Sequence, residues 1–203
     1  MIFPIQNMIR KMNTDEKKIY LTFDDGPVEF TLVVLDLLKK YKIQATFFVI
    51  GQNAEIQKKI MDRISFDGHS IFSHSIDHNY LNYFKSERNI FQWIKHSIEH
   101  LESLTKKKHS IFRPPAGITT PPLIRACVHH NIRIILWSQR FYDSIWPLSI
   151  RKITKYLDKA KAGDIILLHD DQSKGNQKIF LESLEHLITG LLRQGFQLKG
   201  LKF

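Results

Sequence analysis

Two adjacent carboxylates follow a short predicted strand near the start of the chain. Lys18–Phe23 is rich in β-branched and aromatic residues, which predicts a strand, and Gly26-Pro27 predicts the turn that ends it. Asp24 and Asp25 therefore stand where a strand meets a loop. Neighbouring carboxylates repel each other, so both ionise readily only beside a cation. The pair indicates either a metal held by one carboxylate while the other accepts a proton, or an ordinary solvated turn.

Two histidines, His74 and His78, follow another short predicted strand and stand four residues apart. That spacing would place both imidazoles on one face of a helical turn, where they can share a metal. Two histidines and one carboxylate leave coordination positions open for water and substrate, which suits a catalytic rather than a structural metal. A surface or core pair of histidines is the alternative. The acidic pair expected at the same edge of the sheet favours the metal.

Arg113 is followed by two prolines, which remove backbone donors and stiffen the loop. A rigid arginine beside Asp24 could hold that carboxylate ionised and oriented, although a surface arginine in a loop is the alternative. The backbone amides of Ala116 or Gly117, just beyond the prolines, could donate to an oxyanion.

His169 ends an apolar run, residues 165–168, so it should emerge from the core at the end of a strand. Histidine suits a general acid because its pKa lies near neutrality, and a nearby Asp143 would favour the charged imidazolium. The alternative for Asp143 is an ordinary loop residue.

Strand and helix patterns alternate along the rest of the chain. Regular alternation predicts a parallel sheet, and about seven strand–helix units fit a TIM-like (β/α) barrel that is distorted or incomplete. The carboxyl ends of barrel strands share one rim, so the ionisable residues above should meet there. An open doubly wound sheet is the alternative, but no glycine-rich phosphate motif follows the first strand. The ranges are Lys18–Phe23, Ala45–Ile50, His69–Ser73, Ser110–Phe112, Ile132–Trp137, Asp164–Leu168 and Phe196–Leu201 for strands, and Thr31–Tyr41, Asn53–Ile64 (with Asn53 as N-cap), Ser86–Lys107, Thr120–His130, Ile150–Lys161 and Asn176–Arg193 for helices.

Composition limits the class of protein. The 203 residues fit one domain, with 43% hydrophobic and 25% charged residues, as is ordinary for a globular chain. No stretch approaches the roughly 18 apolar residues of a membrane span, and residues 1–11 are too short and broken for a signal peptide. These features predict a cytoplasmic location. The net charge of +10 would suit an anionic partner, but the lysines are scattered, so no nucleic-acid partner is expected. Cys127 is the only cysteine, which excludes an intramolecular disulfide.

Five motifs in order now resemble those of a known family. They are Thr22-Phe23-Asp24-Asp25-Gly26-Pro27, Ala45-Thr46-Phe47-Phe48-Val49-Ile50-Gly51, His74-Ser75-x-x-His78, Arg113-Pro114-Pro115-Ala116-Gly117 and Leu167-Leu168-His169. Together they look like the polysaccharide deacetylase family, the NodB-homology group of carbohydrate esterase family 4. The resemblance implies an N-terminal extension over residues 1–16 and a NodB-homology domain over residues 17–203. It also implies removal of N-acetyl groups from an acetylated amino-sugar glycan of the chitin-oligosaccharide or peptidoglycan type.

The resemblance also implies roles for single residues. Asp24 would be the general base, oriented by Arg113. His169 would be the general acid, tuned by Asp143. Asp25, His74 and His78 would hold one divalent metal, usually zinc, with Co²⁺, Ni²⁺ or Mn²⁺ as alternatives. The substrate would contact Pro115, Ala116, Gly117, Trp146 and Leu167.

The fourth family motif matches least well. Family members often carry Asp-Trp there, whereas Asp143 is followed by Ser144, and Trp146 would supply the aromatic ring from two residues later. Three rival functions stay open from the sequence: an amidase of the same fold that acts on a small non-glycan amide, a catalytically silent glycan-binding module, and a nucleic-acid binder, which only the net charge supports. The identity of the glycan and the oligomeric state are not predicted.

Overall fold

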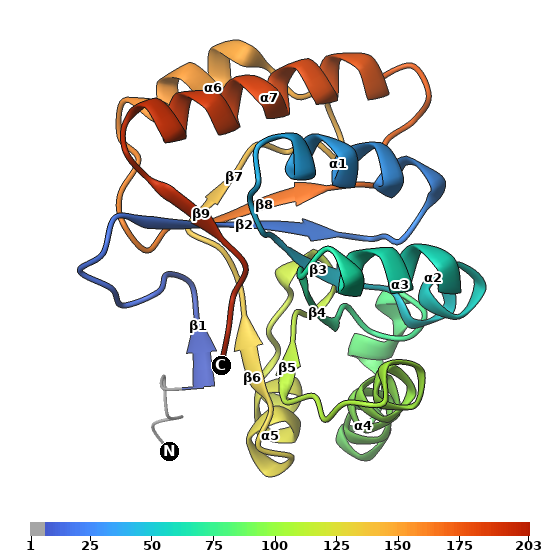
Figure 1. The fold of residues 1–203 in the computed structure, drawn as a ribbon. Helices are drawn as coiled ribbons and strands as arrows, with labels where there is room; N and C mark the ends of the chain where they lie inside the picture. The colour runs from blue at the N-terminus through green and yellow to red at the C-terminus, as the bar shows by residue number, and fades with distance from the viewer. Residues whose placement is uncertain (1–6) are drawn as a thin grey trace.

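The computed structural model describes residues 7–203 and centres on one parallel sheet (Figure 1). The strands run in the spatial order β1-β6-β5-β4-β3-β2-β8-β7, and β9 pairs with β2 beside that path. All pairings between these strands are parallel. The sheet curls into an incomplete barrel, which confirms the predicted fold class. The strands are β1 Met8–Ile9, β2 Lys18–Asp24, β3 Thr46–Val49, β4 Ser70–Ser73, β5 Ile111–Phe112, β6 Arg133–Ile135, β7 Gln139–Arg140, β8 Ile165–His169 and β9 Gln197–Lys199.

Helices cover the outer face of the curled sheet in two groups. Helices α1, α6 and α7 lie above β2 and β8 in Figure 1, while α4 and α5 lie on the opposite side, below β5 and β6. Each group buries its own apolar cluster against the strands. The helices are α1 Glu29–Lys40, α2 Gly51–Ile56, α3 Lys58–Phe66, α4 Glu87–Thr105, α5 Pro121–His129, α6 Ile150–Leu157 and α7 Gln177–Arg193, with short 3₁₀ turns η2 Tyr80–Phe84 and η3 Pro115–Gly117.

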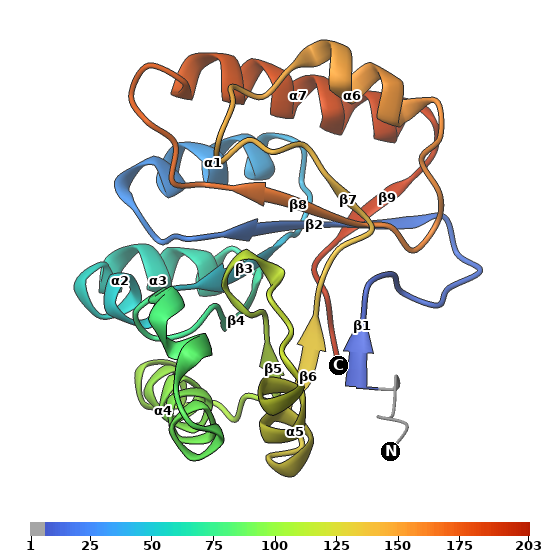
Figure 2. The ribbon, with the colours of Figure 1, turned by 180° about the vertical axis from the view of Figure 1, so that it is seen from behind.

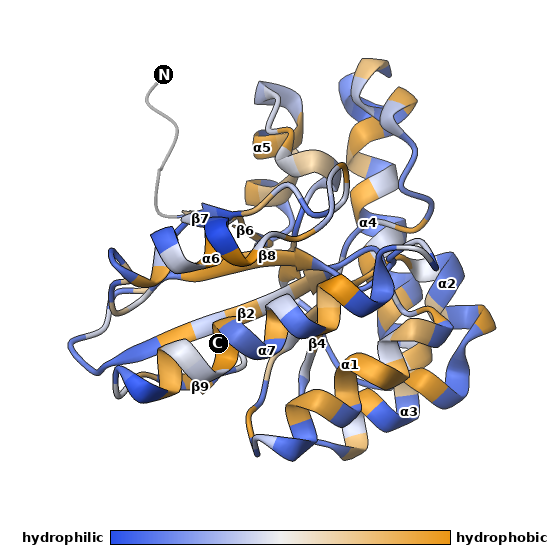
Figure 3. Cartoon of the chain, turned by 90° about the horizontal axis from the view of Figure 1, so that it is seen from above, coloured by the Kyte–Doolittle hydropathy of each residue, from blue (hydrophilic) through white to orange (hydrophobic). Residues whose placement is uncertain are grey.

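One face of β2 packs against the helices, and the other faces the inside of the barrel. Ile19, Leu21 and Phe23 belong to the outer cluster beneath the helices. Side chains alternate along a strand, so the inner face carries Tyr20, Thr22 and Asp24. Tyr20 packs there in a small apolar cluster inside the barrel. Strand β8 is coloured hydrophobic along most of its length in Figure 3, and ends on a polar residue, His169. The polar residues therefore collect at the carboxyl ends of the inner face.

The chain itself spans the seam of the barrel. β6 pairs with β5 and β1, whereas β7 pairs with β8 at the other end of the sheet. Only residues 136–138 separate β6 from β7 in the sequence, and Figure 2 shows the chain rising from one to the other. Ser138 bridges this gap by donating its backbone N–H to the carbonyl oxygen of Ile165 (3.0 Å).

Some predicted elements differ from those observed. The two-residue strands β1 and β7 were not predicted, whereas the equally short β5 was, because Pro114-Pro115 marks its end. The predicted helix Asn53–Ile64 is two helices, α2 and α3, that meet at Gln57 (φ −100°, ψ 46°). The prediction that Asn53 is an N-cap was wrong, because Asn53 lies inside α2. Its side-chain amide donates instead to the carbonyl oxygen of Asp25 (2.9 Å).

The boundary predicted after residue 16 stays a prediction. Residues 1–6 of that segment lie outside the described part of the chain, and Met8–Ile9 pairs with β6. Across residues 7–203, no helix has the length and apolar character needed to cross a membrane. Cys127 is buried, and burial raises the pKa of its thiol to about 12.

Candidate active site

The residues predicted to carry chemistry meet at one rim, at the carboxyl ends of the strands. Asp24 is the register partner of His169 across β2 and β8, which places these two residues side by side. A cavity of about 400 Å³ opens there and is lined by residues from β2, β7 and β8 and from the segments that follow β2, β4, β5, β6 and β7. The lining consists of Asp24, Asp25, His74, His78, Tyr80, Ala116, Trp137, Arg140, Tyr142, Ser144, Ile145, Leu167 and His169.

Asp25, His74 and His78 bring three ligand atoms within 4.8 Å of one another. The Nε2 atoms of His74 and His78 lie 3.4 Å and 3.2 Å from Oδ1 of Asp25. Yet this buried oxygen accepts no hydrogen bond from the part of the chain that the structure describes. Burial opposes ionisation of Asp25, but the two adjacent imidazoles hold the pKa of its carboxyl well below the usual range. An orphaned, ionised oxygen facing two imidazole nitrogens fits a divalent cation.

The ring of His74 is oriented for that role by its other nitrogen. Nδ1 of His74 lies 2.8 Å from the carbonyl oxygen of Arg113, which can only accept, so Nδ1 carries the proton. In the neutral ring, Nε2 then presents a lone pair toward Asp25. Histidine ligands in metal sites commonly have such a partner, which fixes the tautomer and the ring orientation. His74, Asp25 and His78 therefore fit a bound metal.

The loop that holds His78 is not the helical turn predicted from the i, i+4 spacing. Ser75 (φ 72°) and His78 (φ 50°) both adopt left-handed backbone conformations, and the hydroxyl oxygen of Ser75 accepts a hydrogen bond from the backbone N–H of His78 (3.0 Å). The prediction of a helix here was wrong. A kinked loop nevertheless brings the two rings together, with centroids 5.1 Å apart.

Arg113 is fully buried and ties Asp24 to the inside of the barrel. Nη1 donates to Oδ1 of Asp24 (2.7 Å) and to the hydroxyl of Thr22 (2.7 Å). Nε and Nη2 donate to the carbonyl oxygens of Ile135 and Leu136 (3.1 and 3.0 Å). Burial lowers the pKa of Arg113, and the charge of Asp24 opposes that shift. The arginine is therefore not a surface residue of the loop.

A second paired group lies opposite Asp24. Oδ2 of Asp143 accepts the backbone N–H of His169 (2.7 Å), and Oδ1 accepts from the ring Nδ1 of His169 (3.1 Å). Burial alone would lower the pKa of His169, but the hydrogen bond and charge of Asp143, with the charges of Asp24 and Asp25, raise it to about 9. Because Asp143 occupies Nδ1, Nε2 is the ring nitrogen left for a ligand.

The loop after Arg113 offers one backbone donor. Gly117 donates its N–H to the carbonyl oxygen of Pro114 (2.8 Å), so that amide is already used. The N–H of Ala116 (φ 54°) makes no hydrogen bond with the described residues, and Ala116 lines the cavity. Gly117 has a packing role, since a Cβ there would lie 2.5 Å from the ring of Trp137. Pro115 is buried outside the cavity lining, and its carbonyl oxygen accepts from the hydroxyl of Tyr83 (2.9 Å).

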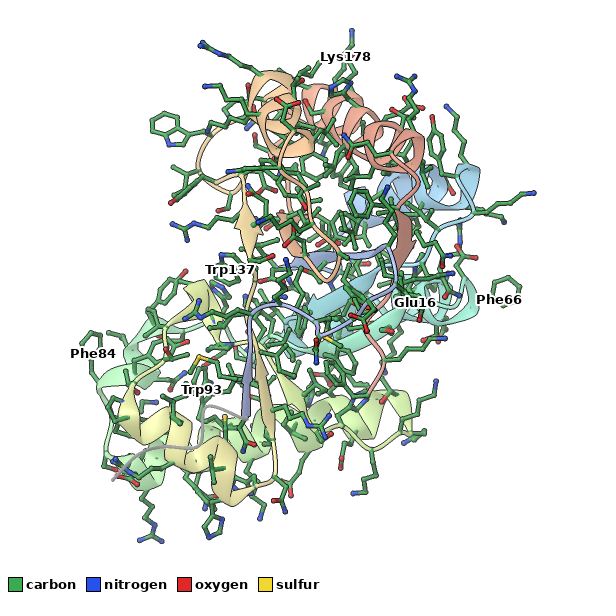
Figure 4. The ribbon with its side chains drawn as sticks, turned by 90° about the vertical axis from the view of Figure 1, so that its left-hand side faces the viewer. Glu16, Phe66, Phe84, Trp93, Trp137 and Lys178 are labelled. Carbon is green, nitrogen blue, oxygen red and sulfur yellow. The ribbon has the colours of Figure 1, made fainter. Side chains whose placement is uncertain are left out.

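Of the two other predicted substrate contacts, Leu167 lines the cavity and Trp146 does not. Trp146 is 63% exposed, on a turn closed by its N–H to the carbonyl oxygen of Tyr142 (2.9 Å). The aromatic side chains of the cavity wall are instead Tyr80, Trp137 and Tyr142. In Figure 4, Trp137 lies near the middle of the molecule, whereas Phe84 projects from its margin.

Several residues of the site were missed by sequence reasoning. Thr22, which binds Arg113, could have been found from its alternation with Asp24 along one strand. Arg140 could not, because β7 was not predicted and only its pairing with β8 turns Arg140 toward the cavity. Tyr142, in the loop after β7, was missed as well.

Comparison with known proteins supports this assembly of motifs. A family model described as polysaccharide deacetylase matches residues 11–135. The peptidoglycan-N-acetylmuramic acid deacetylase of Bacillus subtilis is 34% identical over 196 residues, which cover 93% of this chain and 72% of that protein. A chitooligosaccharide deacetylase of Azorhizobium caulinodans is 30% identical and covers 94% and 96% of the two chains. The crystal structure of the peptidoglycan N-acetylglucosamine deacetylase Bc1960 superposes with a TM-score of 0.85, at 30% identity, over 96% of this chain and 91% of that one. By its motifs, its curled parallel barrel and these similarities, the chain belongs to the polysaccharide deacetylase family and is an N-deacetylase of that family.

Proposed function

We propose that the chain is a metal-dependent hydrolase that removes N-acetyl groups from an acetylated amino-sugar glycan of the peptidoglycan or chitin-oligosaccharide type. The observation that supports this most is the pairing of Asp24 with His169 across β2 and β8. It puts a carboxylate held by Arg113 and an imidazole held by Asp143 on the wall of one cavity. Hydrolysis of an amide needs both a base for water and an acid for the leaving nitrogen.

The metal would be held by Asp25, His74 and His78, whose two nitrogens and one oxygen suit zinc. When bound, it would polarise the amide carbonyl and make water more acidic. The relatives named above act on peptidoglycan or chitooligosaccharide, as their names state, and the same class of substrate is proposed here.

The chain's own residues would then carry the proton transfers. Asp24 accepts a proton from the attacking water, while Arg113 and Thr22 keep its carboxylate in place. The free N–H of Ala116 donates to the oxyanion that develops on the carbonyl oxygen. His169, protonated at neutral pH because of Asp143, gives its Nε2 proton to the departing sugar nitrogen, which would otherwise leave as an amide anion. Leu167 offers an apolar surface to the acetyl methyl group.

The test is acetate release by the metal-loaded chain from acetylated chito-oligosaccharides, peptidoglycan glycan strands and simple small amides, with Asp24→Asn as the inactive control. Release from a glycan, lost on chelation and regained with zinc, is the expected result. Release from small amides alone would support the rival amidase. Glycan binding without acetate release would support a silent binding module. The cytoplasmic location expected from the sequence stays a prediction.

A further inference from the structure

Arg140 is a cation on the cavity wall that the proposed chemistry does not use. It lies at the end of β7, and its register partner on β8 is Leu167, the residue proposed to meet the acetyl methyl group. Registered residues of parallel neighbours point to the same face, and both side chains line the same cavity. Arg140 therefore stands one strand away from the reacting acetyl group, about 5 Å along the sheet.

The guanidinium of Arg140 is held by aromatic rings. Its central carbon lies 3.8 Å from the ring centroid of Tyr142 and 5.9 Å from that of Trp137. A planar guanidinium stacked on a ring keeps its N–H edge free for a ligand. Stacking also restricts the rotation of a long side chain, so less conformational entropy is lost when a ligand binds.

Arg140 has no counter-ion within the described part of the chain. Among residues 7–203, the arginines that form ion pairs are Arg63, Arg113 and Arg125. Arg113, by contrast, pairs with Asp24, and its Nε and Nη2 donate to backbone carbonyl oxygens. A stacked, unpaired guanidinium on the wall of a cavity suits bidentate recognition of a carboxylate.

We propose that Arg140 binds a carboxylate carried by the reacting sugar, so that the preferred substrate is an acidic amino sugar with its carboxylate close to the acetamido group, as in N-acetylmuramic acid. This inference rests on the proposed function and assigns its substrate class. The lactyl ether on O3 of N-acetylmuramic acid is adjacent to the N-acetyl group on C2. A cavity of about 400 Å³ holds little more than one sugar, so the carboxylate that reaches Arg140 belongs to that sugar. A neutral N-acetylglucosamine would leave the guanidinium unpaired.

The experiment compares kcat/KM on three matched glycan oligomers with the metal-loaded enzyme. They are an oligomer of N-acetylglucosamine, an alternating oligomer with N-acetylmuramic acid, and the same alternating oligomer with its lactyl carboxylates methyl-esterified. Mass spectrometry identifies which sugar loses its acetyl group. The wild type should prefer the acidic oligomer at its N-acetylmuramic acid residues, and the ester should lose that preference.

Arg140→Gln should lower the ratio of kcat/KM for the acidic oligomer to that for the neutral oligomer by about tenfold or more, as expected for loss of a charged hydrogen-bonded pair, chiefly through KM. Arg88→Gln, an exposed arginine of α4 outside the cavity lining, is the matched control and should keep the wild-type ratio. This inference would be overturned if the wild type deacetylated both oligomers at similar rates and Arg140→Gln gave the same ratio of kcat/KM for the acidic to the neutral oligomer. The proposed function would still stand. Acetate release from none of the oligomers would overturn the proposed function and this inference with it.

Discussion

The hydrogen bond between Asp143 and His169 should set the alkaline limit of activity. The substitution Asp143→Asn keeps the size of the side chain and an oxygen that can accept the backbone N–H of His169, which Asp143 binds at 2.7 Å. It removes the negative charge that faces Nδ1 of the imidazole at 3.1 Å. The variant therefore tests the charge of Asp143 with little change in packing.

The expected shift follows from the pKa of His169. Asp143 and the neighbouring carboxylates raise it from 6.5 to about 9 against the effect of burial. That difference corresponds to about 3 kcal/mol in favour of imidazolium. Without Asp143, burial acts against only the weaker charges of Asp24 and Asp25, so the alkaline limb should move down by roughly two pH units. A bound divalent cation lowers the pKa in both proteins and leaves the direction unchanged.

The assay is kcat/KM for acetate release against pH, at fixed metal loading, for the wild type, Asp143→Asn and His169→Ala. His169→Ala should lose about 10²–10⁴-fold at the maximum, the usual contribution of a general acid, and should lose the alkaline limb. An alkaline limb at the same pH in all three proteins would mean that another group titrates there, and His169 would not be the acid.

The same pair gives a readout that needs no activity. Because the folded pKa of His169 lies above 6.5, its pairing stabilises the fold fully below about pH 6.5, and that contribution is lost as the pH rises through about 9. The difference in Tm between the wild type and Asp143→Asn should therefore be largest near pH 6 and smallest above pH 9. A difference that does not change with pH would contradict the assignment.

Three further predictions concern the neighbouring groups. Asp25→Ala should lose zinc in calorimetric titration, while Asp24→Asn should bind zinc and lose turnover; the opposite result would exchange their roles. Arg113→Met leaves Asp24 buried without its partner, and should lower the free energy of unfolding in urea by about 3–5 kcal/mol, so a loss below about 1 kcal/mol would refute the argument. Burial raises the pKa of Asp170 to about 7, so this carboxyl destabilises the fold as the pH rises from about 4 to 7. The Tm of Asp170→Asn relative to the wild type should increase over that range, and a constant difference would show that Asp170 is already ionised.

The sequence predicted the inner wall of the barrel only where a single strand shows clear alternation of apolar and polar residues. Strand β2 was predicted as Lys18–Phe23 and observed as Lys18–Asp24, because its alternation and the following turn are both strong signals. The long period of α4 was equally clear. These are local patterns, and they do not depend on which strands become neighbours.

What could not be predicted depends on sheet order. The burial of Arg113 requires that the residues it binds, Asp24 on β2 and the carbonyl oxygens of Ile135 and Leu136, surround one point inside the barrel. Phe48 of β3 lies under the guanidinium, 3.8 Å from its central carbon, which no spacing along the chain indicates. The same holds for Arg140, whose direction is set by its register with Leu167 on a strand far along the chain.

The position of β2 in the sheet has a consequence for how the chain is made. Its neighbours include β3, which follows soon after it, but also β8 and β9, which belong to the last fifth of the sequence. A ribosome adds about 5–20 residues per second, so β2 waits on the order of ten seconds for β8 to be synthesised. During that interval β2 lacks its pairing with β8 and β9, and Asp24 lacks His169 across the strand pair. Such late, long-range pairing slows folding and exposes apolar strands to aggregation. The chain thus brings Asp24 beside His169 only after β8 has been made, and until then β2 lacks that neighbour.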